Sequence, residues 1–125
     1  TLLRLSQFGL DPFLIQHCVK GVLSQRLATQ LCSHCRVPSQ DTPPPFSGHF
    51  TSKGCGHCGQ SGRSGRTVVS EVLRPTPTLL ADLQRDPLLN LSDIAPDRYV
   101  SFEDDLQLKT SAGLISIKDA ITILS

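Results

Sequence analysis

The sequence predicts an α+β fold: a mostly helical small domain, a subdomain built around four cysteines, a short β-hairpin or strand, and small C-terminal helices. Three observations support this prediction. Apolar residues recur at steps of three and four in several segments, which is typical of amphipathic helices. Residues 67–73, TVVSEVL, are rich in β-branched side chains and favour a strand. Finally, the chain contains two Cys-x-x-Cys pairs, Cys32/Cys35 and Cys55/Cys58.

The composition is that of a folded chain with a net charge close to zero. The 125 residues include 38% hydrophobic and 18% charged residues, and the net charge is +1. Bulk electrostatics therefore predict neither nucleic acid nor anionic membrane as a partner. No apolar run approaches the roughly 18 residues of a membrane span, so we expect no membrane insertion. The absence of methionine predicts an excised piece of a longer protein or a processed product, and the excised piece is favoured.

The N-terminal third is predicted to be helical. Residues 1–9 form a first helix that ends at Gly9, because glycine is a common residue after a helix. Asp11 and Pro12 then match a helix start, with a capping side chain followed by proline. An amphipathic helix is expected over residues 12–31, with apolar positions at Ile15, Val19, Val22, Leu23, Leu27 and Leu31.

The cysteine pairs have the spacing of a two-knuckle metal site. A two-residue spacer lets a tight turn point both sulfurs of a pair at one ion, and four thiolates complete a tetrahedral shell around Zn²⁺. Such a closed shell is structural and not catalytic. We therefore expect a zinc-ribbon-like subdomain in which structural Zn²⁺ is bound by Cys32, Cys35, Cys55 and Cys58.

Two other uses of these cysteines stay open at this point. Two disulfides are possible, although the unpaired Cys18 and the lack of a signal-peptide pattern favour a reducing compartment. A thioredoxin-like redox pair would need a Cys-x-x-Cys motif at the start of a helix that follows a strand. Neither pair is predicted to have that setting.

The histidines and the fifth cysteine are not expected to be ligands, because four thiols already complete the shell. His34 and His57 lie inside the two spacers and His49 lies in the intervening loop, and all three are expected to be exposed or beside the ligands. His17 is expected to be partly buried. Cys18 is expected on an apolar helix face, where it would act as a small hydrophobic residue.

The middle of the chain is predicted to be irregular. Residues 37–54 are rich in proline, serine and glycine, and should form the loop that returns the second cysteine pair to the first. Residues 59–66, GQSGRSGR, do not match a phosphate-binding loop, because no Gly-Lys-Ser/Thr ending is present. They should form the turn into the strand. Arg63 and Arg66 are candidates for contacting a partner or a phosphate, with a solvated or salt-bridged role favoured.

Short helices are expected at the C-terminal end. Thr76 caps a helix that runs to about Arg85, and residues 86–97 form a loop. Ser101 starts a helix that ends before a glycine, and Ser116 begins the last helix with a capping-box-like pattern. The three consecutive carboxylates at residues 103–105 cannot face one another on a helix. No catalytic residue is therefore predicted.

The order of these features resembles the C-terminal region of the ATPases of type II secretion and type IV pilus assembly, the GspE/PulE/PilB-like secretion ATPase family. The matching positions are Arg4-Leu5, Gly9, Pro12-Phe13-Leu14, Gln25-Arg26-Leu27, Leu31-Cys32, Cys35, Cys55, Cys58-Gly59, Gly62, Gly65-Arg66-Thr67 and Glu71-Val72-Leu73. Departures from the family pattern occur at Asp11, Arg63, Ser64, Val68, Ser70 and Leu106.

The resemblance implies a cytoplasmic, hexameric parent ATPase held at the inner membrane by platform or docking proteins. It would power pilin or pseudopilin assembly and protein export. ATP and Mg²⁺ would bind only in the parent, because this sequence lacks the phosphate loop, so no cofactor-binding residue is assigned here. Residues 1–31 would end the RecA-like core, 32–73 would form the metal-binding subdomain, and 74–125 would form a small helical subdomain.

An alternative is an independent zinc-ribbon interaction module that binds protein or nucleic acid. Recognition of nucleic acid needs a basic and aromatic surface. The chain has one tyrosine, five phenylalanines and no tryptophan, and its net charge is close to zero. We therefore expect no nucleic-acid partner. A free-standing enzyme is not expected either, because no nucleophile, acid and base are predicted to converge.

Overall fold

The computed structural model describes residues 2–125, with side chains from Arg4 onward, and it contains two compact units. The first unit comprises the chain up to Ser24 together with Glu71–Ser101, and the second comprises Gln25–Ser70 and Phe102–Ser125. Strands β1 (Val22–Leu31) and β4 (Arg63–Leu73) both continue from one unit into the other, and β4 lies between β1 and β5 in a three-stranded sheet. The predicted α+β class is confirmed.

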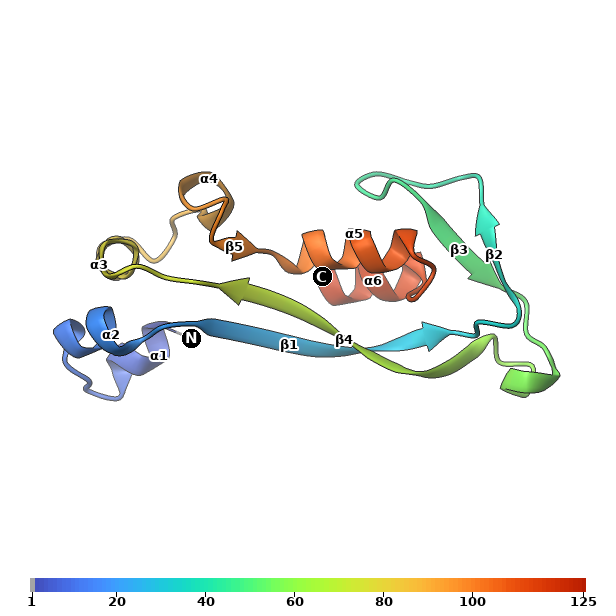
Figure 1. Ribbon diagram of the computed structural model, residues 1–125, viewed down its shortest axis with the longest axis horizontal. Helices are drawn as coiled ribbons and strands as arrows, with labels where there is room; N and C mark the ends of the chain where they lie inside the picture. The colour runs from blue at the N-terminus through green and yellow to red at the C-terminus, as the bar shows by residue number, and fades with distance from the viewer. Residues whose placement is uncertain (1) are drawn as a thin grey trace. The chain divides into compact units, whose positions relative to one another are not determined.

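The first unit combines short helices with the ends of the long strands. It contains α1 (Leu2–Gln7), α2 (Pro12–Cys18), α3 (Pro77–Arg85), α4 (Leu91–Ile94) and β5 (Tyr99–Val100). Helix α2 packs beside α3 (Figure 1), and β5 pairs antiparallel with the end of β4. Its core consists of buried Leu73, Leu79, Leu83 and Ala95, surrounded by the half-buried Val22, Leu89, Leu91 and Tyr99.

Capping side chains fix the helix starts at the predicted places. Asp11 accepts a hydrogen bond from the Phe13 amide at 2.8 Å, and Thr76 accepts one from Leu79 at 3.1 Å. Ser116 likewise accepts from the Asp119 amide at 3.1 Å. These bonds satisfy amide groups that the first helical turn leaves free. The predicted starts of α2, α3 and α6 are confirmed.

The predicted helix over residues 12–31 is wrong beyond Cys18. Helix α2 ends there, Val19 is extended, and residues 22–31 form β1. Leucines four residues apart had indicated one helical face, but Leu23 and Leu27 are 57% and 63% exposed. Pairing with β4, a partner far away in the sequence, determines the conformation of this segment. Such pairing commonly overrides local propensity.

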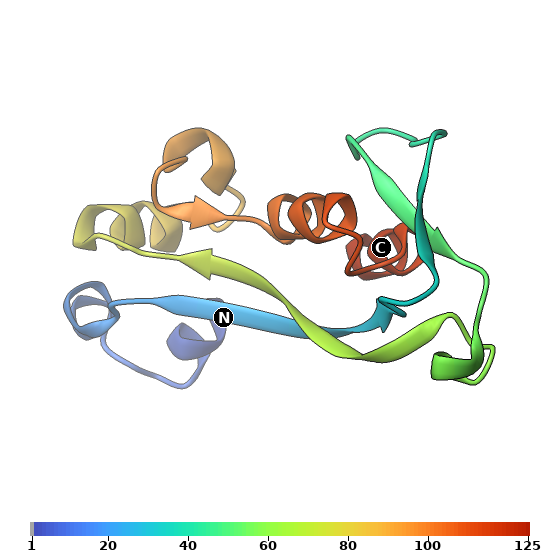
Figure 2. The same ribbon diagram turned by 45° about the vertical axis from the view of Figure 1, so that its right-hand side comes forward.

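The second unit contains a hairpin and two helices that pack side by side. The hairpin strands are β2 (Arg36–Ser39) and β3 (His49–Ser52), and the helices are α5 (Phe102–Ser111) and α6 (Ile117–Leu124). Figures 1 and 2 show the hairpin and the adjacent helices. The buried core residues are Ala28, Phe46, Val69, Leu106, Ile115 and Ala120.

Two segments predicted as loops contain regular structure. Within residues 37–54, β2 and β3 pair antiparallel, with Pro38 opposite Phe50, and the part around the three consecutive prolines is irregular, as are Lys53 and Gly54. This irregular part carries Phe46, which is 6% exposed, into the core. Within residues 86–97, Asn90 caps the one-turn helix α4. Both elements are too short to produce a clear periodic pattern.

The free edge of β4 in the second unit is covered by polar side chains of α5. The Ser70 amide donates to the Asp105 carboxylate at 2.8 Å, and Lys109 donates to the Val68 carbonyl. Lys109 and Asp105 also form an ion pair of 2.6 Å. Unpaired strand groups are satisfied in this way where β5 no longer pairs with β4. Among the described residues, no helix has the length and apolar character needed to cross a membrane.

Candidate metal centre

The four cysteines of the two pairs come together in the second unit. Cys32 directly follows β1 and Cys35 directly precedes β2. Cys55 precedes a single turn of 3₁₀ helix, η1 (Gly56–Cys58), and Cys58 is its last residue; η1 lies between β3 and β4 in the chain. The four Sγ atoms all lie within 4.8 Å of one another. The structure therefore brings together all four residues that the sequence predicted as ligands.

The sulfur separations fit a tetrahedral metal shell. The Sγ atoms of Cys32 and Cys55 are 3.8 Å apart, those of Cys35 and Cys58 are 3.9 Å apart, and those of Cys55 and Cys58 are 3.8 Å apart. A tetrahedron with metal–sulfur bonds of about 2.3 Å has edges of about 3.8 Å. A divalent ion that favours thiolate ligands, such as zinc, could therefore bind at the centre.

The two competing uses of the cysteines do not fit this geometry. A disulfide needs sulfurs about 2.05 Å apart, whereas all five cysteines are unpaired. A thioredoxin-like pair would lie at the N-terminus of a helix after a strand. Cys32 and Cys35 instead lie in a turn between two strands, and Cys55 and Cys58 belong to the cap and the last position of a 3₁₀ helix of only three residues.

Backbone amide groups surround the second pair. The amides of Cys55 and Gly62 donate to Cys58 Sγ at 3.2 and 3.1 Å. Gly59 has a φ of +60°, and Gln60, with a φ of +67°, donates its amide to the Cys55 carbonyl at 2.9 Å. Amide groups that point at a sulfur favour its charged form. The turn thus prepares one thiolate before any metal binds.

Two glycines next to the cysteines are required for this turn, and sequence reasoning did not single out their role. A Cβ on Gly54 would lie 2.5 Å from the Gln60 carbonyl oxygen, and one on Gly62 would lie 2.5 Å from Ser52 Oγ. Both residues also have positive φ angles, of +97° and +73°. In the sequence, this role was indicated by the position of both glycines close to a Cys-x-x-Cys pair.

The environment shifts the pKa values of two thiols in opposite directions. Burial is the main cause that raises the pKa of Cys35 from 9.0 to about 12. Burial also opposes ionisation of Cys58, but the amide hydrogen bonds from Cys55 and Gly62 outweigh it and lower the pKa of Cys58 to about 6. At neutral pH, Cys58 is therefore already a thiolate, whereas Cys35 must release a proton to bind a metal.

The histidines are outside the sulfur cluster, as predicted, but their surroundings differ. His34 and His57 are exposed and stack on each other, with ring centroids 3.9 Å apart. His49 is buried, contrary to the prediction, and its Nδ1 lies 3.0 Å from Thr42 Oγ1. The predictions for residues 17 and 18 are also wrong. His17 is exposed and stacks on Phe13, and Cys18 is exposed because α2 ends there.

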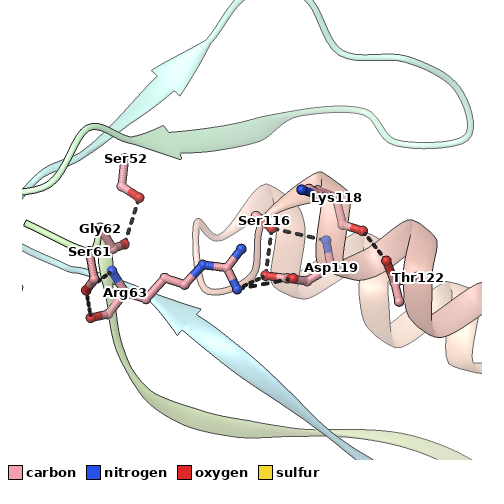
Figure 3. Close-up of polar contacts among 8 residues, drawn as sticks. All are labelled: Ser52, Ser61, Gly62, Arg63, Ser116, Lys118, Asp119 and Thr122. Carbon is pink, nitrogen blue, oxygen red and sulfur yellow. Dashed lines mark hydrogen bonds and ion pairs between the residues drawn. The ribbon is translucent and has the colours of Figure 1, made fainter.

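The nearby arginines have different partners. Arg63 forms an ion pair with Asp119 at 3.1 Å, close to the Ser116 cap of α6 (Figure 3), so its predicted salt-bridged role is confirmed. Arg36 donates to the Gly113 carbonyl at 2.7 Å and lies over the Phe50 ring. Arg66 is exposed, and its side chain has no hydrogen bond or ion pair within the part of the chain that the structure describes.

Comparison with known proteins gives a consistent result. Residues 1–121 match the family model of the type II/IV secretion system protein. The chain is 37% identical over 87 residues to the protein transport protein HofB homolog of Escherichia coli, covering 63% of this chain and 18% of that protein. It is 42% identical over 69 residues to the type II secretion system protein HxcR of Pseudomonas aeruginosa, covering 55% and 13%.

A further relative matches nearly the whole chain. The type II secretion system protein E of Dickeya dadantii is 28% identical over 132 aligned residues, covering 98% of this chain and 26% of that protein. The chain thus spans about a quarter or less of the length of these relatives.

Proposed function

Because this chain belongs to the family of type II/IV secretion system proteins, we propose that it is the zinc-binding C-terminal portion of a bacterial secretion or pilus-assembly ATPase. The parent would be a homohexamer that uses ATP and Mg²⁺ to power pilin or pseudopilin assembly and protein export. It would be cytoplasmic and held at the inner membrane by platform or docking proteins. This portion would contribute structure and partner contacts, not catalysis.

The clustering of four sulfur atoms is the single observation that carries the zinc-binding role. All four Sγ atoms lie within 4.8 Å of one another, and the separations of 3.8 Å for Cys32–Cys55 and Cys55–Cys58 and 3.9 Å for Cys35–Cys58 match the edges of a ZnS₄ tetrahedron. Four protein ligands leave no open coordination position for water or substrate, so the ion would be structural. Cys32, Cys35, Cys55 and Cys58 would hold it, and the ion would join the end of β1 to the start of β4.

The same proposal assigns three parts to the chain. Residues 1–31 would close the RecA-like ATPase core, 32–73 would form the metal-binding subdomain, and 74–125 would form the small C-terminal subdomain. The support for this division is the position of the cysteine pairs between the first two helices and the last helices. Nucleotide would bind in the remainder of the parent, outside this sequence.

Metal analysis of single cysteine variants tests the proposal. The purified chain should contain one zinc ion per molecule, and Cys58→Ser should lose most of it. Cys18→Ser is a matched control, because Cys18 is an exposed cysteine outside the cluster, and it should keep one zinc ion. Folded wild-type protein without metal and with five free thiols would contradict the proposal, as would equal zinc loss from both variants.

A further inference from the structure

Two histidines occupy equivalent positions in the two cysteine turns. His34 directly precedes Cys35 and His57 directly precedes Cys58. Their rings stack with centroids 3.9 Å apart and an angle of 15° between the ring planes. Both side chains are exposed. The stack therefore joins the first turn to the second by a contact that involves no sulfur atom.

We propose that His34 and His57 act as positioning residues for the metal centre. They form an aromatic clasp that holds the two Cys-x-x-Cys turns together without supplying a ligand. The clasp depends on the proposed zinc site, because its effect is on the affinity of that site. His34 and His57 would thus affect how tightly the ion is held, although neither of them binds it.

The membership of the ligand cluster argues against ligation by either ring. Among the described residues, the ligand atoms that all lie within 4.8 Å of one another are the four cysteine sulfurs, and no histidine nitrogen belongs to this group. The four sulfurs already form a complete tetrahedral set. The rings therefore act through their faces.

The clasp reduces the cost of assembling the site. The two cysteine pairs are separated by the hairpin and its irregular loop, and bringing them together costs chain entropy. Other contacts share this task, because the Gly62 carbonyl accepts from the Cys32 amide at 2.9 Å and from Ser52 Oγ at 2.7 Å. A stacked aromatic pair adds a contact at the turn tips that favours the arrangement competent for binding.

Zinc affinity of histidine variants in the full chain tests the clasp. Competition with a chromophoric chelator should show zinc binding about 2- to 12-fold weaker for His34→Ala and for His57→Ala, the range expected for losing one aromatic pair. The double alanine variant should be little weaker than either single variant, because one truncation already abolishes the stack. Stoichiometry should stay at one ion per chain.

Phenylalanine separates stacking from ligation. His34→Phe and His57→Phe should each keep affinity within about twofold of wild type, because the aromatic contact is retained. His17→Ala is the matched control, since His17 is also exposed and stacks on Phe13 but belongs to the first unit and not to the unit that holds the cysteines. It should leave zinc affinity unchanged. Cobalt-substituted wild type and variants should all give the absorption of a four-thiolate tetrahedral site.

Several results would overturn the clasp. Wild-type affinity in both single alanine variants would show that the stack does not act on the site. Phenylalanine variants as weak as alanine variants, or a changed cobalt spectrum, would show that a ring nitrogen matters. If the wild-type chain bound no zinc, the proposed function would fail together with the clasp. Normal wild-type binding with unaffected variants would refute the clasp alone.

Discussion

The two compact units of this chain are stabilised in different ways. The first unit is built from short helices that pack apolar side chains around buried Leu73, Leu79 and Leu83. The second unit also has an apolar core, but its hairpin and turns contribute little to it. Across residues 33–61, only Phe46 and His49 are buried. A two-stranded hairpin is marginally stable by itself.

In the proposed account, this difference is the reason that four cysteines lie in and beside the hairpin segment. Hydrophobic burial stabilises a segment in proportion to the apolar area removed from water. Where turns and prolines leave few apolar side chains to bury, a metal ion can supply the missing free energy. In the proposed account, the first unit depends on burial alone, and the hairpin segment depends on burial plus zinc.

Removing the metal should produce the largest difference in stability between the two units. After zinc is chelated, amide protection from hydrogen exchange should fall across β2, η1 and β3, whereas α3 should keep its protection. The physical reason is that structural zinc contributes folding free energy directly. Hydrogen-exchange mass spectrometry with and without chelator measures both regions in one sample. Equal loss of protection in both regions, or no loss in either, would contradict the comparison.

Truncating the single apolar anchor of the hairpin loop should have the next largest effect. Phe46→Ala should destabilise the second unit by about 3–5 kcal/mol, the usual cost of emptying a buried phenylalanine site. It should also weaken zinc binding, because Phe46 lies between the two cysteine pairs and fixes their loop to the core. Denaturant unfolding and chelator competition measure the two effects.

Leu80→Ala is the control for this experiment, because Leu80 is fully buried in the first unit. A comparable loss of stability of about 2–5 kcal/mol is expected. Zinc affinity of the folded protein should be unaffected by it. Equal weakening of zinc binding by both variants would show that the two units are not stabilised independently.

Neutralising the carboxylate that accepts a hydrogen bond from the edge of β4 should have an intermediate effect on stability. Asp105→Asn should cost about 1–3 kcal/mol, because the carboxylate accepts from the Ser70 amide and pairs with Lys109 in a half-buried site. Glu103→Gln on the same helix is exposed and should change stability by less than about 0.5 kcal/mol. Thermal unfolding of the two variants measures the difference, and similar values would refute the role of Asp105.

The low pKa of Cys58 should be visible in proton release. At pH 7 its thiol is ionised in the metal-free protein, and at pH 5 it carries a proton, because its pKa is about 6. Zinc binding should therefore release about one more proton per ion at pH 5 than at pH 7. Titration calorimetry in buffers of different ionisation enthalpy measures this number.

The proton count should be repeated in the double variant His34→Phe/His57→Phe, which lacks the two imidazoles next to Cys35 and Cys58. The stability of the metal-free protein should also decrease as the pH falls. The contribution of a lowered thiol pKa is present above its ordinary value of 9.0 and is lost as the pH falls through about 6. Constant proton release from pH 5 to pH 7 would contradict the assignment.

The smallest effect is expected at Thr110. Its side chain is fully buried in the second unit, and its hydroxyl has no hydrogen-bond partner among the described residues. Thr110→Val keeps the shape of the side chain and removes an unsatisfied polar group, so it should be neutral or stabilising by about 1 kcal/mol. Thermal unfolding measures it. A loss of more than about 1 kcal/mol would show that the hydroxyl has a partner, such as a buried water.

The sequence predicted the parts of this molecule that local chemistry determines. Asp11, Thr76 and Ser116 cap helices as expected, since a cap depends on residues within one turn. The spacing of the two Cys-x-x-Cys pairs identified all four clustered sulfurs, because the tight turns needed for that spacing are also local.

The errors arose where distant partners determine the structure. Residues 22–31 have a helix-like spacing of leucines, yet pairing with β4 makes them a strand. The hairpin was hidden among prolines and serines, and Phe46 is buried in a core that it shares with Leu106 and Ala120, more than fifty residues later in the chain. The stack of His34 on His57 likewise exists only once the two cysteine turns meet. Local patterns carry no information on such contacts.

X-ray absorption at the zinc edge of the purified protein tests the central claim most directly. We predict one zinc ion per chain, surrounded by four sulfur atoms at about 2.3 Å with no nitrogen or oxygen ligand. A shell containing imidazole nitrogen or water would contradict the claim, as would a folded protein without bound metal.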